Sequence, residues 1–333
     1  MSVPVEAPLE PMPSDGVPEA QDGTAIKGRS LWQIAWGRLR RDKIAMTGGV
    51  VIVLIILMAV FAPLICSIFN VDPFSFNTDQ LDPTTSLPVG PFSGASREHP
   101  LGIEPVSGRD ILARIVYGAR YSLIIAFAAT ALSVVIGVLL GIASGFFGGW
   151  ADTLISRFMD IMLAFPVLLF SIAILVIFQS VDAFAGLSGD GLRVGLLVVI
   201  IGFFGWAYIG RIIRGQVLSL REKEFVDASR SLGARNGRIL YKELLPNLVA
   251  PILVYATLTI PVNILAEAAL SFLGVGLLPP TPSWGQMLST ATTTFSIDPW
   301  FMVVPGLAIF ITVLAFNLFG DGLRDAFDPK SAG

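Results

Sequence analysis

Long apolar runs with few or no charged residues alternate along the chain with short segments rich in Lys, Arg, Asp and Glu. A bilayer core about 30 Å thick is crossed by about 20 apolar residues in helical conformation. We therefore predict transmembrane helices over residues 44–69, 121–146, 154–178, between 193 and 211, 248–273 and 300–319. The pattern indicates an all-α polytopic membrane protein with six transmembrane helices.

One more stretch, residues 268–297, lacks charge but is not predicted to be a separate span. Its first residues extend the fifth helix, and then Pro279, Pro280, Pro282 and Gly285 interrupt the run. Proline removes a helical hydrogen bond and clusters of Pro and Gly mark loops. We expect an irregular loop here, with Trp284 at the lipid boundary.

The amino-acid composition agrees with a membrane location and excludes several other kinds of protein or site. Hydrophobic residues make up 54% of the chain and charged residues 14%, against about 25% charged in globular proteins. Cys66 and His99 are the only residues of their types, so an internal disulfide and a Cys/His zinc site are excluded. We expect both side chains to be structural. The absence of a Gly-x-Ser-x-Gly elbow also argues against an intramembrane hydrolase.

The distribution of basic residues predicts the orientation in the membrane. With six spans and a cytoplasmic N-terminus, 17 Lys and Arg residues lie inside and 5 lie outside. Since cytoplasmic loops carry an excess of Lys and Arg, both termini are predicted to be cytoplasmic. Residues 1–30 are acidic and rich in proline, and we expect a disordered cytoplasmic tail. A cleaved signal peptide is the alternative, but the apolar run that follows is too long for a signal core of about 7 to 15 residues.

The coupling loop, residues 213–247, joins the fourth and fifth predicted spans and is rich in charge. Within 222–232 the apolar Phe225, Ala228 and Leu232 recur at helical spacing, which predicts an amphipathic helix. Gly233 permits a left-handed turn. A second short helix follows, and we expect Pro246 to end it. Residues alone leave four roles open: lipid binding, solvation, a topology anchor, or docking to a cytoplasmic partner.

Three parts of the coupling loop resemble the EAA loop of ABC importer permeases: Asp227-Ala228-Ser229, then Gly233, then Glu243-Leu244-Leu245-Pro246. In that family this segment docks into a groove on the ATPase subunit. The resemblance assigns the docking contacts to Glu224, Phe225, Asp227, Ala228, Ser229, Leu232, Gly233, Ala234, Leu245 and Pro246. The sequence departs from the pattern with Asp at 227, Ser at 229 and Glu at 243, where the family has Glu, Ala and Ile.

Further motifs narrow the resemblance to the dipeptide/oligopeptide/nickel permeases. His99-Pro100-Leu101-Gly102, Gly108-Arg109-Asp110 and Tyr117-Gly118-Ala119-Arg120 look like the segment before the second helix of that branch. The stretches 270–274, 279–285 and 320–325 are similar to its C-type subunit. The resemblance covers residues 31–329. It implies a type I ABC importer permease in the bacterial cytoplasmic membrane, with peptides as cargo and nickel chelates or oligosaccharides as alternatives.

The resemblance also implies partners: a second permease subunit, two ATPase subunits and an extracytoplasmic solute-binding protein, with no role for nucleic acid. The chain contains no Gly-Lys dipeptide and hence no Walker A loop, so ATP and Mg are expected on the partner chains. We expect no cofactor, metal or catalytic residue here. A secondary transporter acting alone is the competing class, but midplane charges and an internal repeat are missing. The residues that line the path are not predicted.

The domain organisation follows from these segments: 1–30 as tail, 31–70 as a basic segment with the first helix, 71–110 as an extracytoplasmic segment, and 111–329 as a five-helix core. The outer segment is a candidate surface for the solute-binding protein or the second permease. Glu267, near the outer end of the fifth helix, is either a gate or substrate contact or an interfacial carboxylate.

Small residues and prolines in the spans add two local predictions. Gly137, Gly141 and Gly145 form a face that lets another helix approach closely, in this chain or a sister subunit. The prolines at 63, 166, 261 and 305 each remove a helical hydrogen bond in or near a span, which produces either bending during gating or static kinks.

Overall fold

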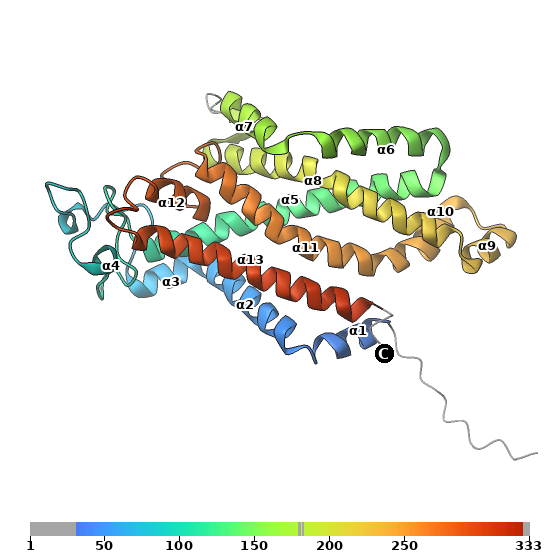
Figure 1. Cartoon of the computed structure of the whole chain (residues 1–333), viewed down its shortest axis with the longest axis horizontal. Helices are drawn as coiled ribbons and strands as arrows, with labels where there is room; N and C mark the ends of the chain where they lie inside the picture. The colour runs from blue at the N-terminus through green and yellow to red at the C-terminus, as the bar shows by residue number, and fades with distance from the viewer. Residues whose placement is uncertain (1–30, 179–180, 182, 329–333) are drawn as a thin grey trace, which may run out of the picture.

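The computed structural model describes residues 31–178, 181 and 183–328, so the predicted acidic tail and residue 329 lie outside the described residues. The chain forms an elongated bundle of helices whose long axis runs horizontally in Figure 1. Five helices are long and apolar enough to cross a membrane, and a bent pair makes a sixth crossing if counted as one span. The all-α polytopic fold is therefore confirmed.

The first apolar run is not one continuous helix. A short helix α1 (Leu31–Leu39) precedes α2 (Lys43–Val60), whose first backbone N–H groups are capped by the Asp42 carboxylate. The run then breaks at Phe61, and α3 (Ala62–Phe69) continues with Pro63 in its first turn. Proline fits the first turn of a helix but not its interior, which explains why the predicted helix over 44–69 divides here.

The outer segment, residues 71–110, contains a short 3₁₀ turn η1 (Thr78–Gln80) and the short helix α4 (Pro91–Gly94). It leads into α5 (Ile111–Phe147), capped by the Asp110 carboxylate, which accepts from the N–H of Ala113 at 2.7 Å. This helix begins ten residues before the predicted start, because Arg114 is buried against Glu104 of the outer segment rather than facing lipid.

The third predicted span is bent. Helix α6 (Gly149–Ala164) and helix α7 (Val167–Phe178) meet at Phe165 and Pro166 with an angle of 81°. The predicted span over 154–178 is therefore divided at Pro166, one of the prolines expected to bend or kink a helix, because the α conformation is disfavoured for the residue before a proline. The strands β1 (Ala183–Phe184) and β2 (Leu187–Ser188) then form a small antiparallel hairpin.

Helix α8 (Gly189–Arg221) packs along α5 over much of its length. The glycine face of α5 lies against it: a Cβ on Gly137, Gly141 or Gly145 would come within 2.8 Å of atoms in the segment 206–217. The neighbour of this face, left open by the sequence, is thus α8 of the same chain. Close approach of two backbones is the packing that small residues permit in lipid.

After α8 come α9 (Glu224–Ser231), α10 (Asn236–Arg238), a π-helical turn η2 (Ile239–Leu244) and α11 (Leu245–Phe272). The chain is helical without interruption from Asn236 to Phe272. Pro246 therefore does not end a helix, contrary to prediction. It lies in the first turn of α11, just after a turn with i→i−5 bonding, where its missing N–H leaves the helix intact.

The loop predicted around Trp284 is a helix, α12 (Trp284–Ala291), which precedes α13 (Trp300–Phe327). Trp284 is buried, not at the lipid boundary, and its indole N–H donates to the carbonyl of Ile115 at 3.1 Å. It belongs to the main apolar core, which α2, α5, α11, α12 and α13 build together. A buried Trp needs a partner for its N–H, and the α5 backbone supplies it.

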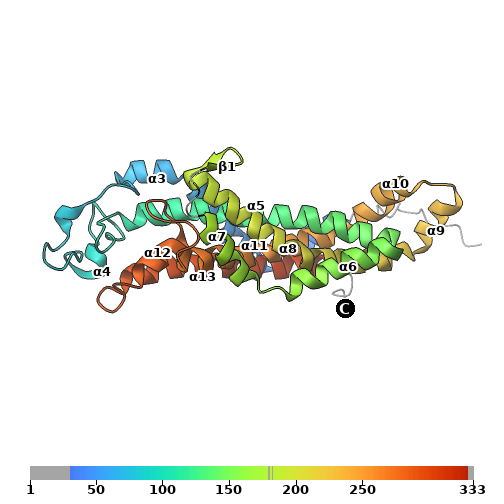
Figure 2. The same cartoon turned by 90° about the horizontal axis from the view of Figure 1, so that it is seen from above.

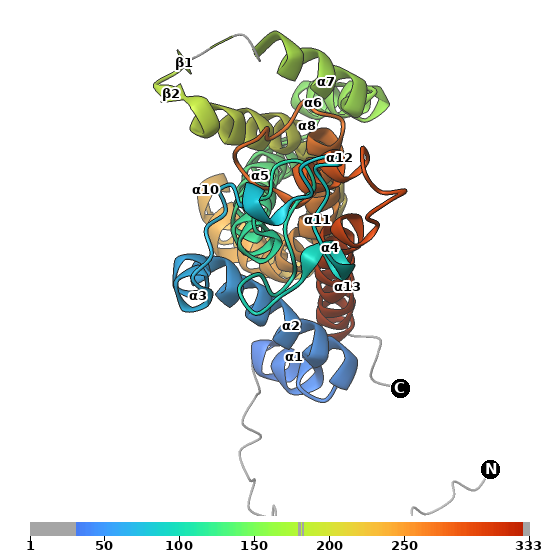
Figure 3. The ribbon, with the colours of Figure 1, turned by 90° about the vertical axis from the view of Figure 1, so that its left-hand side faces the viewer.

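Two functional ends result from this arrangement. Helices α9 and α10 project at one end, which we call the coupling end, and the outer segment with α4 and α12 occupies the opposite, outer end (Figure 2). Seen along the long axis, α6 and α7 lie at one edge of the molecule and α1 and α2 at the other, with α5, α8 and α11 between them (Figure 3).

Candidate functional site

The coupling loop begins with a helix attached to the bundle by a single buried side chain. Val226 of α9 is fully buried in a cluster with Phe146, Val217 and residues of η2 and α11. Its neighbours Phe225 and Asp227 are exposed. Burying an apolar side chain of this size contributes about 1.5–3 kcal/mol. Val226 therefore fastens one side of α9 to the bundle and leaves its other sides open.

Gly233 ends α9 in the left-handed conformation that the sequence predicts, with φ of +78°. The N–H of Gly233 donates to the carbonyl of Arg230 at 2.9 Å, and the N–H of Ala234 donates to the carbonyl of Ser229 at 3.0 Å. This pair of bonds is the Schellman arrangement, which satisfies the last carbonyls of a helix. A Cβ on Gly233 would meet no atom within 4 Å, so the turn faces open space.

A side-chain hydrogen bond holds the two arms of the loop together. The Ser229 hydroxyl donates to Glu243 Oε1 at 3.1 Å, joining α9 to the π-helical turn η2. Ser229 and Glu243 are two of the three departures from the EAA pattern, and the structure brings them into contact. The pair thus makes a polar contact between α9 and η2 close to the turn.

The predicted site residues fall into two groups. Exposed residues are Glu224, Phe225, Asp227, Ala228, Leu232, Gly233 and Pro246, and partly buried ones are Ser229, Ala234 and Leu245. Leu245 and Pro246 belong to the start of α11. The other eight residues lie on α9 and the turn that follows it. The structure thus places eight of them around one turn and two at the base of the span that follows.

The surface that α9 and its turn present is partly apolar although it lies at the end of the bundle. Leu232 is 88% exposed and Phe225 is 38% exposed. Exposed apolar side chains of this size are typical of protein interaction sites. Sequence reasoning missed Val226, whose burial against η2 and α11 depends on the tertiary fold.

The base of the loop is tied to the bundle by charged groups as well. Arg221, at the end of α8, donates to the carbonyl of Gly145 at 3.0 Å. Arg214, two turns earlier, forms a two-pronged pair with Asp152 of α6 at 2.6 and 2.8 Å. Such bidentate pairs add geometric restraint to the energy of a hydrogen bond. The start of the coupling loop is therefore tied to both α5 and α6 through the last turns of α8.

At the outer end, the motif residues before α5 form a buried polar cluster. Arg114 Nε lies 2.5 Å from Glu104 Oε1, and the same guanidinium donates to Gln286 and to the carbonyl of Pro280. His99 Nδ1 lies 2.7 Å from Asp110 Oδ2. Burial raises the pKa of the Asp110 carboxyl above its ordinary value, against the opposing effect of the Ala113 N–H and of His99. These motif residues fix the outer segment onto α5 and α12.

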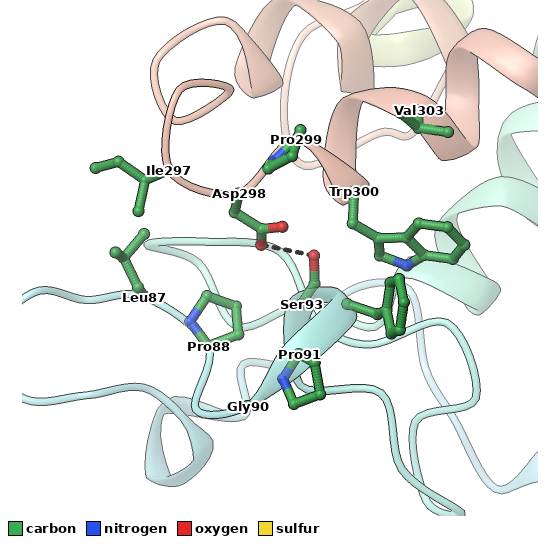
Figure 4. Close-up of a pocket in the computed structure, with 11 residues that line it drawn as sticks. Leu87, Pro88, Gly90, Pro91, Ser93, Ile297, Asp298, Pro299, Trp300 and Val303 are labelled. Carbon is green, nitrogen blue, oxygen red and sulfur yellow. Dashed lines mark hydrogen bonds between the residues drawn. The ribbon is translucent and has the colours of Figure 1, made fainter.

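A pocket of about 500 Å³ opens where the outer segment meets the start of α13 (Figure 4). Ser93 donates to Asp298 Oδ2 at 2.6 Å across it. Phe92 and Trp300 make an edge-to-face contact with centroids 5.0 Å apart. The lining is Leu87, Pro88, Gly90, Pro91, Phe92, Ser93, Ile297, Asp298, Pro299, Trp300 and Val303. The pocket is an apolar hollow with one carboxylate.

Glu267 proves to be an internal residue. Its side chain is fully buried on α11, and it accepts hydrogen bonds from Ser122 at 2.8 Å and Ser271 at 2.7 Å. The interpretation of Glu267 as a carboxylate at the membrane interface is therefore wrong, because the side chain is buried. Neighbouring hydroxyl groups supply the hydrogen bonds that its carboxylate needs. Hydroxyl donors from two helices make it a link between α5 and α11.

Comparison with known families agrees with this architecture. Residues 137–333 match the family described as binding-protein-dependent transport system inner membrane component. Residues 30–88 match the N-terminal TM domain of oligopeptide transport permease C. The first match contains the whole coupling loop and the second contains α1, α2 and α3.

Relatives and a solved structure extend the comparison. The dipeptide transport system permease protein DppC of Alkalihalophilus pseudofirmus is 41% identical, covering 97% of this chain and 96% of that protein. The oligopeptide transport system permease protein OppC of Bacillus subtilis is 41% identical over 91% of each chain. The glutathione transport system permease protein GsiD of Escherichia coli is 38% identical over 92% of each chain.

A chain of the MetNI methionine ABC transporter, solved in an inward-facing conformation, has a TM-score of 0.50 and 19% identity to this chain. The superposition covers 64% of this chain and 95% of that chain, which supports the shared fold. The family match and the similarity to these relatives over at least 91% of the chain identify the family. The chain belongs to the family of binding-protein-dependent transport system inner membrane components, as a multi-pass inner membrane permease subunit of an ABC importer.

Proposed function

We propose that this permease subunit imports di- and oligopeptides, and that two partner ATPase subunits drive the complex, one of them docking on the exposed turn at Gly233. The observation that carries the coupling role is the turn itself. It is rigidly closed by two backbone hydrogen bonds, fastened by Val226 and open to space around Gly233. A partner socket can approach such a turn closely, while Phe225 and Leu232 supply apolar contact.

ATP and Mg belong to the partner chains in this proposal, since no Walker A sequence is present here. The proposed orientation places both termini and the coupling end in the cytoplasm, following the excess of Lys and Arg there. A second permease subunit completes the path. The outer segment and the pocket beside Trp300 are the proposed surface for the solute-binding protein.

Peptide cargo is supported by the relatives, which are named for dipeptide, oligopeptide and glutathione transport. These solutes share peptide amides and free charged termini. Nickel chelates and oligosaccharides are the competing cargoes within the same fold. A secondary transporter is the competing mechanism, and it needs no ATPase chains.

Reconstitution of the complete complex tests both parts. We expect the permease to co-purify with ATPase chains and, in vesicles loaded with ATP, to take up a radiolabelled dipeptide presented with the cognate solute-binding protein. Uptake of a nickel chelate or an oligosaccharide in preference to peptides would contradict the cargo assignment. Undiminished uptake after removal of ATP would contradict the coupling assignment.

A further inference from the structure

Polar residues form a stripe on the uncovered side of α6 and of the half of α8 nearest the coupling end. On α6 the stripe contains Thr153, Arg157 and Asp160, and on α8 it contains Tyr208, Arg211, Gly215 and Ser219; all of these are exposed. Spacings of three and four residues place each set on one face of its helix. The two faces adjoin, since α6 packs along α8 (Figure 1).

An ion pair stands at the centre of the stripe. Arg211 and Asp160 are in direct contact, and their side chains are 52% and 54% exposed. The contact joins α6 to α8, so neither group is free to extend toward the membrane surface. Exposed charge in a membrane-spanning segment is costly unless it meets water or protein.

Packing against α5 shows how deep this pair lies. A Cβ on Gly141 would lie 2.7 Å from the carbonyl oxygen of Gly210, so Gly141 is level with Gly210 and Arg211. From Gly141, α5 continues without a charge for six residues to its end at Phe147. At a rise of 1.5 Å per residue, Arg211 lies about 9 Å inside the level where this apolar helix ends.

The stripe stops at an aromatic cluster where α6 meets α7. Phe204 is buried there, stacked on Phe165 with centroids 6.1 Å apart and in edge contact with Phe170 at 5.3 Å. Beside the stripe, the exposed face of α6 is apolar, with Leu154 62% and Ile161 56% exposed. Polar and lipid-compatible surfaces are thus separated on the same helix.

We propose that this stripe lines the inner half of the solute path and that the Asp160–Arg211 pair is the polar contact that a peptide with charged termini meets there. The assignment of peptides rests on the proposed function, whereas the aqueous exposure of the stripe does not. A carboxylate and a guanidinium side by side match the ammonium and carboxylate ends of a zwitterionic peptide.

Cysteine labelling tests the aqueous exposure, because the chain contains a single cysteine, Cys66, which is buried. In a Cys66→Ala background, single variants R157C, Y208C and G215C report on the stripe, and L154C and I161C on the same or adjoining helix report on the apolar face. The complete complex in lipid nanodiscs is treated with a charged, membrane-impermeant methanethiosulfonate reagent. A lipid-soluble maleimide shows that each thiol is reactive.

We expect the stripe variants to react with the charged reagent at least about tenfold faster than the two controls, because a charged probe partitions poorly into lipid. Equal, slow reaction at both sets of positions would overturn the assignment of the stripe to a water-filled path.

Charge substitutions test the role of the ion pair. We expect Asp160→Asn and Arg211→Gln to shift the uptake ratio of acidic to basic dipeptides in opposite directions, each by about fivefold, since each leaves one unpaired charge. Equal loss of uptake for all peptides in both variants would overturn the proposed contact and leave only a structural ion pair. Uptake of a neutral dipeptide by the unaltered complex, measured in the same vesicles, separates failure of this proposal from failure of the peptide assignment.

Discussion

The apolar residues of α9 and its turn have two different roles: one is buried and attaches the helix to the bundle, and others are exposed and available to a partner. Val226 points into the cluster at the coupling end, whereas Phe225, one position earlier, and Leu232 at the turn are exposed. A helix of eight residues has little stability of its own, because helix nucleation is unfavourable. Its position therefore depends on Val226, and its contact with a partner depends on the exposed side chains.

Truncation of these two neighbours should give opposite phenotypes. We expect Val226→Ala to lower the free energy of unfolding at the coupling end by about 2 kcal/mol, because it leaves a cavity in the cluster. Phe225→Ala should lower stability less, since 38% of this side chain is exposed, and should weaken association with the ATPase subunits. Thermal unfolding and size-exclusion chromatography of the complex measure the two effects. Equal destabilisation by both variants would contradict the division of roles.

The hydrogen bond between Ser229 and Glu243 gives a second prediction at this scale. Ser229→Ala should weaken the link between α9 and η2 by about 1 kcal/mol, the usual net value of one hydrogen bond. Faster hydrogen exchange of the Gly233 and Ala234 amides would report it. Glu243→Gln, which keeps an acceptor oxygen, serves as the control and should exchange at the original rate. Identical protection in Ser229→Ala would show that the bond does not hold the turn.

At the scale of elements, the number and places of the crossings followed from the sequence, and the prolines indicated where bends could occur but not how large they are. Apolar composition reports only that a segment is compatible with lipid, so the breaks at Phe61 and before Pro166 left no trace in the charge pattern. The early start of α5 was hidden because Arg114 and Arg120 looked like span boundaries, whereas Arg114 is buried by Glu104 and Gln286.

Within the candidate site, the sequence predicted best the features that depend on the backbone conformation of a single residue. The turn at Gly233 was predictable because only glycine readily adopts its positive φ. Contacts between the two arms of the coupling loop were not predictable, since the approach of Glu243 to Ser229 depends on the path of the chain through α10 and η2. For the same reason the periodicity of α9 could identify its exposed face but not the buried role of Val226.

Packing of α5 against α8 gives a prediction at the scale of elements. Gly141→Leu should separate these helices and lower the yield of folded permease severely, because even a Cβ would come within 2.7 Å of backbone. Gly191→Leu is the matched control in α8, since nothing lies within 4 Å of its added Cβ. Detergent-solubilised protein recovered as a single chromatographic peak measures the difference. Equal recovery of both variants would contradict the helix pairing.

Across the whole molecule, long rods connect the coupling end to the outer end. Helix α8 has 33 residues, and the uninterrupted helix from Asn236 to Phe272 has 37. At 1.5 Å per residue these rods are about 50 and 55 Å long. Each starts or ends at the coupling loop, so a displacement of that loop is also a displacement of the helices beside Glu267 and the outer segment. In the proposed function, binding of ATP by partner chains uses this connection to bias the permease between two conformations.

The ratio of ATP hydrolysed to peptide imported, measured in vesicles that contain the complete complex, tests this coupling most directly. The informative variant is Gly233→Trp, compared with Gly233→Asn, because Asn tolerates positive φ and adds less bulk. A Cβ at position 233 would meet no atom of this chain, so the cost of either substitution within the chain comes from the positive φ, which Asn tolerates better than Trp. We predict that Gly233→Trp continues to hydrolyse ATP while importing little peptide, and that Gly233→Asn keeps a ratio near that of the unaltered complex. An unchanged ratio in Gly233→Trp would contradict the account.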